Sequence, residues 1–185
     1  MFNLFKKSVP AAVKAFRQTL AENTADRDGL ADIAGRAEGL VKARKQARER
    51  VLTDPTDANL QQLITALDDE ARLVPVFEKV VVAAKVGTFN RIAERSREPA
   101  RECLSTCISE LETTLEKLIL AEREVAESIG LPWEPSSNVR RLDDTVKGLR
   151  GNLARLTAEP VDESREARAT RVSSVVGSLS EFLGV

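Results

Sequence analysis

Apolar residues in the second half of the chain recur at alternating intervals of four and three. The positions are Leu104, Ile108, Leu111, Leu115, Leu118, Glu122, Val125 and Ile129, of which only Glu122 is polar. This heptad spacing places a narrow apolar stripe along an α-helix, and such a stripe must be buried against another helix. A second stripe with the same spacing runs from Val139 to Leu156 without a polar interruption. The pattern therefore predicts two packed helices.

The segment between the two stripes is short and contains Gly130, Pro132 and Pro135. A short loop of this kind folds consecutive helices back on each other in antiparallel orientation. Pro99 is expected to open the first helix, which spans residues 100–129, and Ser136 or Ser137 to cap the second, which spans residues 137–158. Residues 100–158 are thus the clearest predicted hairpin.

The first half of the chain also has helical spacing. A short helix is expected to end near Asn23, and a second, capped by Thr24 or Asp26, to reach Leu52. A turn is then expected at residues 53–57, where Thr-Asp-Pro-Thr-Asp supplies a helix stop and a new cap.

The segment that follows this turn is expected to be helical, with a kink or short break at Pro75. Apolar residues of the stretch 76–97 occupy more than one helix face, so we expect this helix to have two neighbours and to be the most buried. A last helix, capped by Asp162, brings the expected total to six or seven.

The predicted fold class is all-α, as an elongated antiparallel helical bundle or a chain of helical hairpins with coiled-coil-like packing. Residues 1–24 are expected to form an amphipathic N-terminal segment with a short helix. Residues 25–185 are expected to form the bundle as a single domain. The composition, 42% hydrophobic and 31% charged with 4% aromatic residues, agrees with long helices.

Composition argues against several function classes. The net charge of −1 gives no overall attraction to nucleic acid or to an anionic membrane. No apolar run approaches the roughly 18 to 20 residues of a membrane-spanning helix, and the first residues do not resemble a signal peptide. The expected location is therefore the cytoplasm or a particle assembled inside the cell.

The sequence offers few of the residues and motifs that enzymes use for catalysis. The chain contains no histidine and no tyrosine, and its nine glycines form no phosphate-binding loop. Cys103 and Cys107 are four residues apart on a helix, too far for a disulfide, and without a third cysteine they cannot complete a zinc site. We expect both to be buried free thiols. No catalytic, cofactor-binding or metal-binding residues are assigned, and we expect the protein not to be an enzyme.

Charge is segregated along the chain. Residues 36–50 contain six basic and two acidic side chains, whereas residues 110–127 contain six acidic and two basic ones. Each segment is interpreted as a solvated face or as the neighbour of the other, and nucleic-acid binding by the basic segment is disfavoured because no aromatic residue is interleaved with the arginines. Arg44 and Glu122 each interrupt an apolar stripe, so we expect them to set register and suggest that they pair.

Two further features are candidates for interaction. The N-terminal cluster comprises Phe2, Leu4, Phe5, Lys6 and Lys7, and with the helix that follows it would either pack into a groove of a bundle or lie at a membrane interface. Packing is the favoured interpretation. Trp133, the only tryptophan, is expected to cover the end of the bundle, with an anchor for a partner as the alternative.

These patterns predict a non-catalytic structural or assembly protein that acts through contacts between helix faces. Its partner would be a second copy or another protein. One setting for such contacts is a large multi-subunit particle, and virus-like and phage particles belong to this class. No small-molecule substrate is expected. The alternative is a peripheral membrane protein anchored through residues 1–20.

Overall fold

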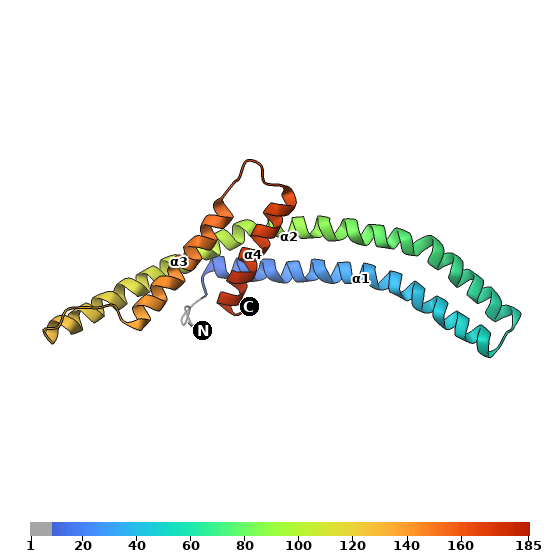
Figure 1. The fold of residues 1–185 in the computed structure, drawn as a ribbon, viewed down its shortest axis with the longest axis horizontal. Helices are drawn as coiled ribbons and strands as arrows, with labels where there is room; N and C mark the ends of the chain where they lie inside the picture. Colours follow the sequence, from blue (N-terminus) through green and yellow to red (C-terminus); the bar gives the residue numbers. More distant parts are fainter. Residues whose placement is uncertain (1–8) are drawn as a thin grey trace. The chain divides into compact units, whose positions relative to one another are not determined.

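The computed structural model describes residues 9–185, and this part of the chain forms four α-helices (Figure 1). Their bounds are Ala11–Thr53 for α1, Asp57–Ser128 for α2, Ser137–Thr157 for α3 and Arg165–Leu183 for α4. No strand occurs among the described residues. The predicted all-α fold class is confirmed.

The chain divides into two compact units. One, called here the core unit, comprises Met1–Ala21 and Ile92–Val185, and the other, called the hairpin unit, comprises Glu22–Arg91. α1 and α2 each contribute residues to both units, whereas α3 and α4 belong to the core unit alone.

The core unit contains the hydrophobic core. Its fully buried side chains come from all four helices and include Phe16 of α1, Leu104 and Leu111 of α2, Leu156 of α3 and Leu179 of α4. The predicted stripes supply much of this core, because heptad positions face the neighbouring helices. Within this unit the stretch 92–128 therefore packs against α3, α4 and the first residues of α1.

The hairpin unit is two antiparallel helical segments joined by the turn at residues 54–56, as the sequence predicted (Figure 1). The turn is held by the Asn59 side-chain amide, which donates to the Asp54 carbonyl oxygen at 2.7 Å. Among residues 22–91, all of which the structure describes, Ala47 is the one buried apolar residue. Two helices alone leave much of each helix surface uncovered.

The helix breaks predicted near Asn23 and at Pro99 are wrong, and of the kink or short break expected at Pro75 the break does not occur. α1 is continuous past Asn23 and Thr24, and α2 is continuous through both Pro75 and Pro99. Proline removes one backbone donor and crowds the preceding turn, but packing on either side can hold the helix together. Ser96 and Ala100, which flank Pro99, are buried in the core unit. Four long helices consequently replace the expected six or seven.

Helix ends in the second half follow their local signals closely. Gly130 adopts a φ of 68°, the left-handed conformation predicted for a residue that ends a helix. Ser136 caps α3 and accepts a hydrogen bond from the Val139 N–H at 3.3 Å. α4 is capped by Ser164, not by Asp162 as predicted.

The expectation that residues 76–97 form the most buried helix is also wrong. Val76, Val80, Val82, Val86 and Phe89 are all exposed. The pattern correctly indicated an apolar surface on more than one face, but within this chain the hairpin unit covers one face only.

Candidate functional site

A line of exposed apolar side chains runs along α2 in the hairpin unit. It consists of Leu60, Ile64, Leu67, Val82, Val86 and Phe89, and is called here the α2 apolar face. At 3.6 residues per turn these positions lie on one side of the helix, together with Ala71, Pro75 and Glu78. Ile64 is 58% exposed and Val82 is 64% exposed. Glu78 interrupts the line, and exposed apolar side chains grouped along one helix side are typical of surfaces that a partner covers.

The α2 apolar face is distinct from the surface that α2 presents to α1. Leu63, Leu73, Phe77, Val81 and Ala84 are half-buried between the two helices of the hairpin unit. Val76 and Val80 are exposed on a further side. Because α2 is apolar around most of its circumference here, its composition suits a helix with more than one neighbour.

Arg44 lies within the hairpin unit and forms an ion pair with Glu70, with 2.5 Å between Nε and the carboxylate. Both side chains are partly buried between α1 and α2. An ion pair that is partly buried between two helices favours one alignment of these helices along their axes. Arg50 adds a hydrogen bond from Nη1 to the Gln62 side chain at 3.4 Å. Two side chains of the basic segment, Arg44 and Arg50, thus contact α2 of the same hairpin.

Glu122 lies in the core unit and has a different role. Its carboxylate accepts hydrogen bonds from the Ser136 backbone N–H at 3.2 Å and from the Ser136 hydroxyl at 2.5 Å. It therefore ties α2 to the cap of α3. The suggested Arg44–Glu122 pair is not formed, and the acidic segment instead pairs Glu112 with Arg150 of α3 at 2.6 Å.

The end of the α2–α3 hairpin presents a second exposed apolar patch. Its exposed members are Leu120, Val125, Ile129 and Leu131. A cavity of about 520 Å³ lies here, lined in part by Val125, Ile129 and Trp133. The last two heptad positions, Val125 and Ile129, are therefore not covered by α3.

Trp133 is half-buried at this hairpin end. The Arg123 guanidinium lies over the indole ring, 4.7 Å from its centroid. The indole N–H is buried and has no hydrogen-bond partner among the described residues. Trp133 thus packs against its own hairpin, and the alternative that it anchors a partner stays a prediction.

The N-terminal candidates divide into two groups. Phe2, Leu4, Phe5, Lys6 and Lys7 lie outside the described residues. Beyond them, Val13 and Phe16 are fully buried in the core unit, and Leu20 packs against the same core. The apolar face of this part of α1 is therefore used for folding.

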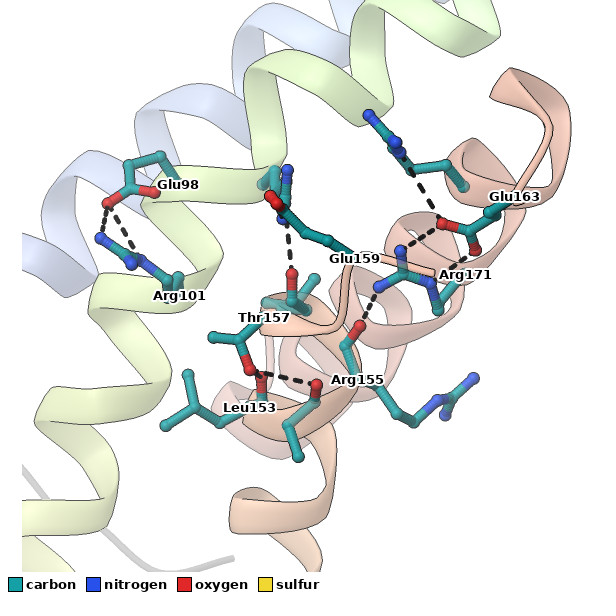
Figure 2. A network of polar contacts seen from close by, with 12 residues as sticks. Glu98, Arg101, Leu153, Arg155, Thr157, Glu159, Glu163 and Arg171 are labelled. Atoms are coloured by element: carbon teal, nitrogen blue, oxygen red, sulfur yellow. Dashed lines mark hydrogen bonds and ion pairs between the residues drawn. The ribbon is translucent and has the colours of Figure 1, made fainter. Parts of the chain in front are cut away.

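A polar network in the core unit joins the middle of α2, the C-terminal end of α3 and the first turns of α4 (Figure 2). Arg97 donates to the Leu156 carbonyl oxygen at 3.2 Å and pairs with Glu159 at 3.0 Å. Arg171 donates two hydrogen bonds to the Glu163 carboxylate, at 2.8 and 2.5 Å, and also contacts the Arg155 carbonyl oxygen. These contacts fix the α3–α4 connection.

Electrostatics in this network favour the charged forms. The hydrogen bonds from Arg171 hold the pKa of Glu163 below its ordinary value, and the positive charge of Arg168 acts in the same direction. The same contact raises the pKa of Arg171. We interpret the Glu163–Arg171 pair as structural, because each charge already has the other as its partner.

Cys103 and Cys107 are buried free thiols, as predicted. The hydrogen bond with Cys107 and burial in the core raise the pKa of the Cys103 thiol. A protonated, buried thiol is a poor nucleophile. The same hydrogen bond lowers the pKa of the Cys107 thiol. Both side chains are fully buried and pack in the core of the core unit.

No group of three or more acidic or cysteine side chains is arranged to hold a metal ion in residues 9–185. Across the same residues, no helix combines the length and the apolar character needed to cross a membrane.

Comparison with known proteins supplies no relative. No protein-family model, no curated protein and no solved structure matches this chain.

Sequence reasoning named Arg44, Glu122 and Trp133 but missed the α2 apolar face. The signal was present, because Leu60, Ile64 and Leu67 follow one another by four and three residues. Helical spacing indicates a helix here, but it does not distinguish a stripe buried within the chain from one left exposed.

Proposed function

We propose that this chain is a non-catalytic structural or assembly protein, which acts by binding protein partners through helix faces. The observation that carries the proposal is the α2 apolar face, six large apolar side chains exposed along one side of a helix. Burying one such side chain contributes about 1.5 to 3 kcal/mol. The six side chains are 39 to 64% exposed, so covering them would contribute part of this amount for each, in favour of association and against its entropic cost.

The remaining chemistry of the chain supports this interpretation. Charged groups that are partly buried pair within the chain, as in Arg44–Glu70 and Arg171–Glu163. The buried thiols face the core. The exposed apolar side chains are the groups left without packing neighbours, and a subunit of a larger assembly carries such surface.

Membrane anchoring by residues 1–20 receives less support. Val13 and Phe16, which would have to enter the lipid, are buried in the core unit. An interfacial helix must keep its apolar side free for the bilayer.

The test substitutes the apolar face and asks whether complexes persist. The variant Ile64→Gln/Val82→Gln places two amides on the face, and we expect it to weaken association by at least about tenfold, since two buried apolar side chains exceed the 1.4 kcal/mol of one decade. Sedimentation velocity of the purified chain, and of complexes isolated under mild conditions from producing cells, measures this.

A matched control carries the same kind of change on α1. Ala25→Gln/Ala31→Gln adds two amides at exposed positions of the hairpin unit and should leave association unchanged. Circular dichroism verifies that both variants stay helical. The proposal is wrong if every complex of the chain survives the substitutions on α2, or if the chain forms no complex with any protein.

A further inference from the structure

We propose that the α2 apolar face binds the same face of a second copy of this chain, with the two α2 helices antiparallel about a two-fold axis near Pro75. The inference rests on the proposed function and names its partner. Two independent features of residues 57–91 support it, the spacing of the apolar residues and the distribution of charge.

The spacing of the apolar face is nearly symmetric about Pro75. Ile64 and Val86 each lie eleven residues from Pro75, and Leu67 and Val82 lie eight and seven residues away. Leu60 and Phe89, at the two ends, lie fifteen and fourteen residues away. In an antiparallel pair, residues at equal distances from the axis face each other across the interface. Each of these six large apolar side chains of one copy would thus meet another of the six in the second copy, while Ala71 would lie opposite Glu78.

The charges of the same segment are distributed in a complementary way. Residues 57–70 carry four acidic side chains and no basic one, and residues 71–91 carry four basic side chains and one acidic one. Glu70 already pairs with Arg44 of α1 and Asp69 with Arg72, so the contrast rests on Asp57 and Asp68 in one half and on Lys79, Lys85 and Arg91 in the other. Antiparallel pairing places these two sets side by side. Parallel pairing would place like charges together, which disfavours that orientation.

One pair of charges is especially suited to test this arrangement. Asp68 and Lys79 are exposed and eleven residues apart, which is close to three full turns, so both lie on the same flank of the apolar face. The two-fold axis brings the same flanks of the two copies together. Asp68 of each copy would therefore lie near Lys79 of the other.

Pairing of this kind also explains why the hairpin unit has so little core of its own. Two hairpins joined through α2 make a four-helix arrangement, in which each α2 is covered by α1 on one side and by the second α2 on another. Both apolar sides of α2 would then have a neighbouring helix.

The first experiment is thiol cross-linking of the purified full chain. Ile64→Cys and Val86→Cys are prepared separately and mixed, and cysteine keeps an apolar character at both positions. Within one helix these positions are about 33 Å apart at 1.5 Å per residue, so a covalent product must join two chains. Native Cys103 and Cys107 are fully buried and act as background in both variants.

Antiparallel pairing predicts a covalent dimer from the mixture and none above background from Ile64→Cys alone. A cross-linked dimer of Ile64→Cys with itself would indicate parallel pairing and would overturn the inference. A mixture that gives no covalent dimer would also overturn it.

The second experiment exchanges charges. Asp68→Lys should weaken dimerisation by about tenfold, and Asp68→Lys/Lys79→Glu should restore it, because the double variant recreates unlike neighbours across the axis. Glu49→Lys, an equal change of charge at an exposed position of α1, is the control and should have little effect. Failure of the second substitution to restore dimerisation contradicts the proposed register.

The two proposals fail in different ways. A chain that forms complexes sensitive to Ile64→Gln/Val82→Gln but gives no cross-link between positions 64 and 86 retains the proposed function and loses the antiparallel dimer. A chain that forms no complex at all loses both.

Discussion

The two charged residues that interrupt the apolar pattern each form a polar contact between consecutive helices. Arg44 pairs with Glu70 inside the hairpin unit, and Glu122 holds the N-terminal cap of α3 through Ser136. The sequence predicted that a polar residue interrupts each apolar stripe, but it did not predict which residue each one contacts. A heptad position specifies which face a side chain occupies, and the partner depends on which helix the fold brings to that face.

The Glu163–Arg171 pair gives a pH prediction at this scale. The pKa of Glu163 is lower in the folded chain than its ordinary value, so the stabilisation by this pair is fully present above that ordinary value. It is lost as the pH falls through the depressed pKa of the folded state. Glu163→Gln should therefore lower stability at neutral pH and should reduce the loss of stability on acidification. Urea denaturation at a series of pH values measures both effects.

Glu166→Gln provides the comparison, because Glu166 is an exposed carboxylate in the first turn of α4, three residues after Glu163, and forms no ion pair with the described residues. An acid dependence identical in Glu163→Gln and in the unaltered chain would show that this pair does not contribute.

At the scale of elements, tertiary packing overrides the local helix breakers. Pro99 was expected to begin a helix, yet α2 is continuous through it because buried residues on both sides hold the two turns in line. The packing that compensates for the proline comes from other helices, so no local pattern contains it. By contrast, the turn at residues 54–56 and the end of α2 at Gly130 were predictable, because each requires a specific backbone conformation that its residues favour.

Pro99→Ala tests this account of α2. Alanine removes the clash of the ring with the preceding turn and supplies an N–H donor, whereas proline restricts the unfolded chain. The balance should raise the free energy of unfolding of the core unit by about 1 to 3 kcal/mol. Pro132→Ala, in the loop after α2, lacks the helical gain and should be neutral or slightly destabilising. Urea denaturation distinguishes the two, and a less stable Pro99→Ala would contradict the account.

The whole molecule combines a unit with a full core and a unit without one. The core unit buries large apolar side chains from all four helices, while the hairpin unit exposes most of its own along α2. The sequence predicted helices and helix-face contacts correctly as a class. It did not show which stripes are buried within the chain. The stripe that contains Leu104 and the stripe that contains Leu60 have the same spacing, yet Leu104 is buried and Leu60 is exposed.

The molar mass of the purified full chain in solution tests the central claim most directly, by light scattering coupled to size exclusion over a wide range of concentrations. Association through the α2 apolar face predicts twice the chain mass of 20.3 kDa, falling toward the single-chain mass on dilution and in Ile64→Gln/Val82→Gln. A mass of 20.3 kDa at every concentration would contradict the antiparallel dimer.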